Sequence, residues 1–275
     1  MNNYKELPGQ YPQDAVKWAE GIAAMNAKAE ELQGQGLLPI RFPTPVETVS
    51  SQPAPAIVDL TEAVPQVNLL AQVISERLST PDKVTAYWRE KLSADGARAG
   101  IDIVVPDCDW TAEEIRRPMV DREGREVPGM MVYKPFRGGG GLNLLGKMYP
   151  EMTQSSIDTP VIENDERIGW FKVEALIDAP NLNSSQKQLE GFAIKTGYLG
   201  QRLSTYILAS QASKDLVGEF FDQETSSRLL GSRGNGFVLY VLIQSWNDQF
   251  SAEWRLPPED HFAYLGGRFE EVKRV

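Results

Sequence analysis

The chain has 275 residues, of which 28 are Lys or Arg, 38 are Asp or Glu and one is Cys. This length suits one large domain or two small ones, and it allows a sizeable core without disulfides or metal. The formal net charge of −10 is spread along the chain without a block of like charges, which excludes a charged tail and disfavours nucleic acid and anionic membranes as main partners.

The first predicted element is an alanine-rich helix over residues 13–33, which Gly34 and Gly36 end. Its apolar stripe is thin, so it should pack on another surface rather than fold alone. Residues 37–66 contain six prolines, a density that favours extended backbone. The sequence therefore predicts a helical arm with a proline-rich linker over 1–66 and a body over 67–275.

The body begins with two predicted helices. Apolar residues recur every three or four positions over residues 67–78, which is typical of an amphipathic helix. Thr80 and Pro81 then supply a cap and a first-turn proline for a second helix. Gly96 or Gly100 ends that helix.

From residue 101 onward, short strands and helices are mixed. A strand is predicted over 101–105, and a short helix over 111–117 has Thr111 as its cap. Residues 119–120 and 130–133 are predicted to pair as a hairpin around a turn at 121–124.

The second half continues the mixture. Strands are predicted over 169–177, 237–243 and 246–256, with a turn over 231–236. A capping box at Ser185 and Gln188 predicts a helix to about Thr196. Residues 201–213 suit another helix, although 205–208 also fit a strand. The predicted body is α+β, with a mixed, mainly antiparallel sheet and several helices.

One glycine-rich segment matches a phosphate-binding pattern. Gly141, Gly146 and Lys147 satisfy G-x-x-x-x-G-K, in which main-chain N–H groups and a lysine hold phosphate. Against this interpretation, Met148 stands where a magnesium-binding Ser or Thr belongs, and Pro150 follows too soon for the usual helix. The alternative is a flexible glycine loop over 138–147 that buries its leucines.

Three carboxylates are candidate magnesium ligands. Asp107 and Asp109 follow the predicted strand 101–105, and Asp178 follows the predicted strand 169–177. If those strands are neighbours, the three side chains offer the oxygen ligands that Mg²⁺ prefers. The alternative is that Asp107 and Asp109 form a turn and a helix cap.

Nucleophilic catalysis has few candidates in this chain. Cys108 is the single cysteine and His261 the single histidine, so one Cys–His pair is the only such dyad that can be drawn. The segment Leu230–Gly234 falls one residue short of the G-x-S-x-G pattern of serine hydrolases. One Cys and one His cannot complete a structural zinc site.

Four arginines lie beside glycine or serine in predicted turns. These are Arg202, Arg228, Arg233 and Arg268. Such arginines bind phosphate or a partner's carboxylate, or they are simply solvated turn charges.

Disulfide bonds within the chain are impossible with one cysteine. The sequence shows no apolar run of membrane-spanning length and begins with polar, proline-containing residues, which argues against a secretion signal. We therefore expect a cytoplasmic protein with no membrane partner.

Together these patterns favour a non-enzymatic interaction or assembly protein whose N-terminal arm docks on a neighbouring chain. The alternative is a Mg²⁺-dependent, phosphate- or nucleotide-handling enzyme that uses the glycine loop at 138–147. A second alternative is a nucleic-acid-associated protein of a mobile element that acts through the arginine turns. The sequence identifies no cofactor beyond those that the enzyme alternative would need.

Overall fold

The computed structural model describes residues 68–152, 161–234, 236–244, 249–254 and 256–273. All of them belong to the second of the two units into which the chain divides, Val64–Val275. The predicted arm and linker over 1–66 lie outside the described residues, so their conformation and the domain boundary at residue 66 stay predictions.

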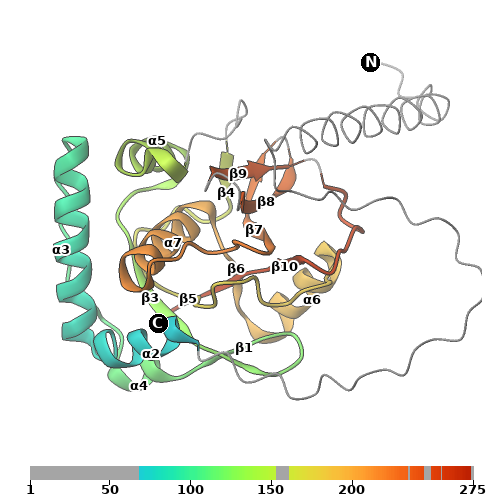
Figure 1. The fold of residues 1–275 in the computed structure, drawn as a ribbon, viewed down its shortest axis with the longest axis horizontal. Coiled ribbons are helices and arrows are strands. Elements are labelled where there is room, and N and C mark those ends of the chain that lie inside the picture. Colours follow the sequence, from blue (N-terminus) through green and yellow to red (C-terminus); the bar gives the residue numbers. More distant parts are fainter. Residues whose placement is uncertain (1–67, 153–160, 235, 245–248, 255, 274–275) are drawn as a thin grey trace, which may run out of the picture. The chain divides into compact units, whose positions relative to one another are not determined.

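The described chain mixes helices and short strands (Figure 1). In chain order the elements are α2 (Leu69–Arg77), α3 (Pro81–Ala99), α4 (Ala112–Arg116), β1 (Met119–Val120), β2 (Glu126–Val127), β3 (Gly129–Lys134), α5 (Gly138–Met148), the 3₁₀ turn η2 (Pro150–Met152), β4 (Val161–Glu163), β5 (Gly169–Glu174), α6 (Gln186–Thr196), β6 (Leu199–Gly200), α7 (Leu203–Val217), β7 (Ser226–Gly234), β8 (Phe237–Gln244), β9 (Gln249–Glu253), β10 (Leu265–Gly267) and β11 (Phe269–Val272).

The strands form three sheets. One is the hairpin β1–β2, one has four strands in the order β3-β5-β11-β6, and one has the order β10-β7-β8-β9 with β4 also paired to β7. Among the described residues, β10 with β7 is the one parallel pairing, and the other pairings are antiparallel. The predicted α+β body with a mainly antiparallel sheet is confirmed.

Helix ends follow the capping signals of the sequence. The side chain of Thr80 accepts a hydrogen bond from the first turn of α3, and Gly100 ends that helix with a φ of 69°. Ser185 and Gln188 form a reciprocal capping box at the start of α6, and Gly197 ends it with a φ of 76°. Glycine adopts these left-handed angles without the steric cost of a Cβ atom. The predicted ends of both helices are confirmed.

Helix α7 forms the centre of the core. Every residue from 203 to 213 is buried, and α7 contacts β3, β5 and β7 as well as α2 and α5. Figure 1 accordingly shows α7 in the middle of the body, with α3 at its edge. The helix predicted over 201–213 is confirmed, and the alternative strand over 205–208 is wrong.

The strand predicted over 101–105 is wrong. These residues are irregular and fold back on the end of α3, where the Ile101 N–H donates to the Gly96 carbonyl oxygen. The Nε of Arg89 in α3 donates a hydrogen bond to the Val105 carbonyl oxygen at 2.9 Å. The Ile101 N–H and the Val105 carbonyl oxygen therefore pair with α3 instead of with a neighbouring strand.

The predicted hairpin exists with a different second strand. β1 pairs with residues 126–127 across a turn in which Gly124 has a φ of 80°. Residues 130–133 instead lie in β3, which pairs with β5 and is buried from Met130 to Lys134. β3 is an edge strand of its sheet, and it is buried because α3, α4 and α7 pack against it.

The turn predicted over 231–236 starts too early, because β7 continues to Gly234 and the turn before β8 is found at Gly236, which has a φ of 84°. Glycine is required at position 231 because β7 passes close to the main chain of Gly200 and Gln201. The Gly231 N–H donates to the Gln201 carbonyl oxygen, and a Cβ atom on Gly231 would lie 2.4 Å from the Gly200 carbonyl oxygen. The two glycines let β6 of the four-stranded sheet cross against β7 of the five-stranded sheet.

We predict that Gly200→Ala destabilises the fold. Its Cβ would lie 2.2 Å from Leu230 Cβ and 2.9 Å from the Gly231 nitrogen, and overpacking of this kind costs about 1–3 kcal/mol. Gly191→Ala is the matched control, because it lies within α6 with open space around it. The control should be neutral or stabilising by up to ~1 kcal/mol. Urea unfolding of both variants measures the difference, and equal stabilities would contradict a tight crossing.

Candidate functional site

The buried charged residues set the frame of the site. Arg202, Arg228 and Arg268 are each no more than 1% exposed, so neither sequence interpretation, a binding group in a turn or a solvated charge, was right for these three. Arg233 differs, since it is half-buried on β7. A guanidinium cannot lose its charge at ordinary pH, so burial demands acceptors around it.

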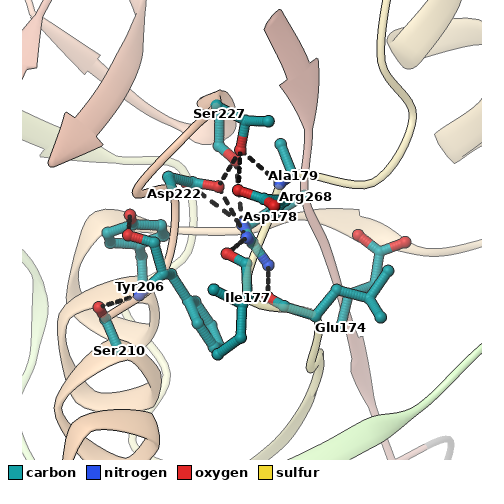
Figure 2. Close-up of polar contacts among 12 residues, drawn as sticks. Glu174, Ile177, Asp178, Ala179, Tyr206, Ser210, Asp222, Ser227 and Arg268 are labelled. Carbon is teal, nitrogen blue, oxygen red and sulfur yellow. Dashed lines mark hydrogen bonds and ion pairs between the residues drawn. The ribbon is translucent and has the colours of Figure 1, made fainter. Parts of the chain in front are cut away.

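Arg268 lies where the chain leaves β10 in one sheet and enters β11 in the other. Its guanidinium donates to Asp222 at 2.7 Å and to the Ile177 carbonyl oxygen at 2.9 Å, and its Nε donates to Ser227 at 2.9 Å. Figure 2 shows Arg268 at the centre of these contacts, with Tyr206 reaching toward them from α7. The network joins the sheet crossover to the loops before β7 and after β5.

A second buried network surrounds the start of α7. Arg202 Nε lies 2.6 Å from Glu270 Oε1, and its guanidinium stacks 4.1 Å above the centre of the Phe171 ring. Lys134 pairs with Glu163 at 2.9 Å, and Glu163 accepts the main-chain N–H of Ser204 at 2.8 Å. A carboxylate is favourable at this position because the first turn of a helix carries partial positive charge.

Two further buried groups have displaced pKa values. Burial raises the pKa of Glu174 to about 8, although the Phe269 N–H and Arg268 act in the opposite direction. Burial lowers the pKa of Lys172 to about 8, and its ammonium donates to the carbonyl oxygens of Glu114 and Arg117 at the end of α4. Both shifts favour the neutral form, as expected for charges removed from water.

An open cleft of about 1090 Å³ lies beside the Arg268 network. Its walls come from four segments, the start of α2 (68–70), the β1–β2 hairpin (121–127), the loop after β5 (176–182) and the region 217–224 between α7 and β7. The apolar lining residues are Leu69, Leu70, Val127, Leu176, Ile177, Ala179, Pro180, Leu182 and Val217. We call this cavity the acidic cleft for the reason given next.

The acidic cleft holds most of the excess negative charge of the body. Its acidic residues are Asp121, Glu123, Glu126, Asp178, Glu219 and Glu224, and its one basic residue is Arg125. The described residues as a whole contain 22 Lys and Arg against 28 Asp and Glu, a net charge of −6. The residues that line the cleft therefore carry a net charge of −5, out of −6 for all described residues.

Hydrogen bonds hold the walls of the acidic cleft in place. Asp121 accepts the main-chain N–H of Arg125 at 2.8 Å and its side chain at 2.6 Å. The amide of Asn181 accepts the Arg122 N–H at 2.7 Å and donates to the Gly267 carbonyl oxygen at 2.9 Å. Hairpin, loop and sheet crossover are thus tied together, and the cleft is preformed.

The three predicted magnesium ligands are not brought together. Asp107 pairs with Arg89 at 2.9 Å, Asp109 lies 3.9 Å from Lys273, and Asp178 accepts from the Thr225 hydroxyl at 3.2 Å in the acidic cleft. No group of three or more His, Cys, Asp or Glu side chains among the described residues is placed to hold a metal ion. The separation follows from the absence of the strand expected at 101–105.

The glycine loop predicted over 138–147 is wrong as a conformation, because residues 138–148 form helix α5. Gly141, Gly146 and Lys147 lie inside that helix. Main-chain N–H groups beyond the first turn of a helix bond to the preceding turn and are not available to phosphate. The phosphate cradle that G-x-x-x-x-G-K suggests therefore lacks the loop it requires.

Cys108 and His261 lie in different environments, one buried and the other exposed. Cys108 is buried, and burial raises the pKa of its thiol to about 11, the opposite of an activated nucleophile. His261 is exposed in the segment 257–264, with its Nδ1 3.3 Å from the Glu259 carbonyl oxygen.

No family model, curated protein sequence or solved structure matches this chain. The assignment of a function therefore rests on its own residues. Within the described part of the chain, no helix is both long enough and apolar enough to cross a lipid bilayer.

We predict a pH-dependent stability that Glu174 carries. The folded protein keeps a proton on Glu174 up to about pH 8, whereas the unfolded chain loses it near pH 4.3. The contribution of Glu174 to the free energy of unfolding is therefore complete below about pH 4.3. It falls as the pH rises toward 8, by at most ~1.4 kcal/mol per pH unit.

Urea unfolding between these two pH values measures how the free energy of unfolding falls as the pH rises. This fall should be smaller for Glu174→Gln than for the wild type. Glu90→Gln, on the exposed face of α3, should keep the wild-type slope. The range stays below pH 8, because deprotonation of Lys172 then acts in the opposite direction. Identical slopes for all three proteins would contradict the assignment.

Proposed function

We propose that this protein is a non-enzymatic interaction protein whose acidic cleft binds a positively charged, partly apolar segment of a partner chain. The observation that carries the proposal is the concentration of net charge, since the cleft holds −5 of the −6 of the described body. Walls of one sign focus the electrostatic field, attract an oppositely charged partner and speed its association.

The lining also fits the apolar part of such a segment. Leu69 and Leu182 are exposed in the cleft, and Leu176 and Ile177 are half-buried there. Apolar side chains of the partner can bury against these residues while Lys or Arg side chains reach the carboxylates at the rim. The open shape suits a peptide segment better than a fully enclosed small molecule.

Binding is favoured over catalysis by the kind of residues in the lining. The described lining carries carboxylates, amides, aliphatic side chains and one guanidinium, and no Ser, Thr, Cys, His, Lys or Tyr. The buried groups with displaced pKa values, Glu174 and Lys172, are engaged with the main chain and lie outside this lining. Carboxylates that face an open cleft attract cations without further chemistry.

The test uses a dye-labelled peptide of roughly a dozen residues that alternates Lys and Leu. We expect saturable binding to the full chain that weakens steeply from about 50 to about 200 mM salt, since screening shortens the reach of exposed charges. The triple variant Glu126→Gln, Glu219→Gln, Glu224→Gln should bind at least ~10-fold more weakly in fluorescence anisotropy.

The matched control is the triple variant Glu90→Gln, Glu113→Gln, Glu166→Gln. It makes the same change in net charge at exposed positions outside the cleft and should keep the affinity of the wild type within about twofold. If both triple variants bind alike, or if the wild type does not bind, the cleft is not the docking surface.

The same proposal gives residues 1–66 the role of an arm that docks on a neighbouring chain. It rests on the sequence, in which an alanine-rich helical pattern precedes a proline-rich linker. A linker of this length can extend to roughly 100 Å, well beyond its own body. The arm carries more acidic than basic residues, so its docking surface on the neighbour differs from the acidic cleft.

Deletion of residues 1–66 tests the arm. Residues 67–275 contain the described core and should keep a cooperative thermal transition. The solution mass measured by light scattering should fall toward the monomer, or partner binding should be lost. An unchanged mass together with unchanged partners would exclude docking by the arm.

A further inference from the structure

An exposed pair of stacked aromatic rings lies in the segment 257–264 before β10. The rings of Phe262 and Tyr264 are 5.6 Å apart between centres and nearly parallel, at 7°. Phe262 is 39% exposed and Tyr264 is 57% exposed. Two aromatic rings held together at the surface offer a flat, partly apolar face to a partner.

The strand register brings the main chain of Tyr264 close to one wall of the acidic cleft. β10 pairs with β7 from Leu265 opposite Ser226, and the Ser226 N–H donates to the Tyr264 carbonyl oxygen at 2.8 Å. Thr225, the residue before Ser226, donates its hydroxyl to Asp178 of the cleft at 3.2 Å. Tyr264 is thus linked through Ser226 and Thr225 to the Asp178 wall, and the two rings lie outside the lining of the cleft itself.

A buried arginine holds the segment that carries the rings. Arg228 donates through Nη2 to the Pro257 carbonyl oxygen at 3.1 Å and to the Asp260 carbonyl oxygen at 2.7 Å. The Leu265 N–H donates to the Phe262 carbonyl oxygen at 2.9 Å. The rings are thus presented on an anchored turn, which reduces the entropy lost when a partner binds.

Building on the function proposed above, we infer that the partner segment is recognised through arginine, with one guanidinium stacked on the Phe262–Tyr264 pair while neighbouring cationic side chains occupy the acidic cleft. Carboxylates attract Lys and Arg alike, so the cleft by itself does not choose between them. A flat aromatic face does choose, because the planar guanidinium stacks on it and gives up its water more easily than an ammonium does.

The experiment compares two labelled peptides that differ only in whether the cationic positions are Arg or Lys. The full-length wild type should bind the Arg peptide about 3- to 10-fold more tightly, as expected for a partly exposed cation–π contact. The double variant Phe262→Ala, Tyr264→Ala should lose that preference and keep the affinity for the Lys peptide within about twofold.

Phe237→Ala is the matched control. Phe237 is an exposed aromatic residue at the start of β8, and its loss should leave the arginine preference unchanged. Equal binding of both peptides by the wild type, or an arginine preference that survives in the double variant, overturns the inference and leaves the cleft as a docking surface. Failure of the wild type to bind either peptide rejects the proposed function, and the arginine inference falls with it.

Discussion

The structure depends most on one buried ion pair, Arg268 with Asp222. Arg268 stands where the C-terminal chain passes from one sheet to the other, and both side chains are fully buried. Because a guanidinium stays charged, the fold must bring a carboxylate and further acceptors to it. It does so with the loop that contains Asp222 and with the carbonyl oxygens of Leu176 and Ile177. Those same loops form two walls of the acidic cleft, so the pair that joins the sheets also shapes the candidate binding surface.

Buried ion pairs of this kind define an arrangement more than they stabilise it. Removing two charges from water costs about as much as their attraction returns, while one unpaired charge costs several kcal/mol more. Arg202 with Glu270 links the start of α7 to β11, and Lys134 with Glu163 links β3 to β4. An alternative packing of α7 or a slipped strand would separate such partners. Each pair therefore penalises wrong arrangements of the sheets around the central helix, which is our hypothesis for why so polar an interior is retained.

Local structure could be predicted from the sequence wherever a local interaction decides it. The capping signals at Thr80, Ser185 and Gly197 identified helix ends, because a cap is made within a few residues. The prediction fails at residues 101–105, where packing on α3 decides the conformation, and at 138–147, where a glycine-rich segment forms a helix instead of a loop. The acidic cleft could not be predicted either. Its carboxylates come from separate segments, and of these only Asp178 was singled out by its place after a strand.

The charge of the chain shows why spacing along the sequence was a poor guide to this surface. Among the described residues, buried ionisable side chains number six of each kind, and their charges nearly balance, since Glu174 keeps its proton up to about pH 8. The cations are Lys91, Lys134, Lys172, Arg202, Arg228 and Arg268, and the acids are Asp95, Asp121, Glu163, Glu174, Asp222 and Glu270. An interior must be balanced in this way, because an uncompensated charge is costly there, whereas at the surface water screens an excess of one sign. The excess of the body is thus set mainly by its surface, and folding gathers acids from the β1–β2 hairpin, the loop after β5 and the end of α7 around one cleft. A charge that is diffuse along the chain becomes local in space, and that locality gives the surface its preference for a cationic partner.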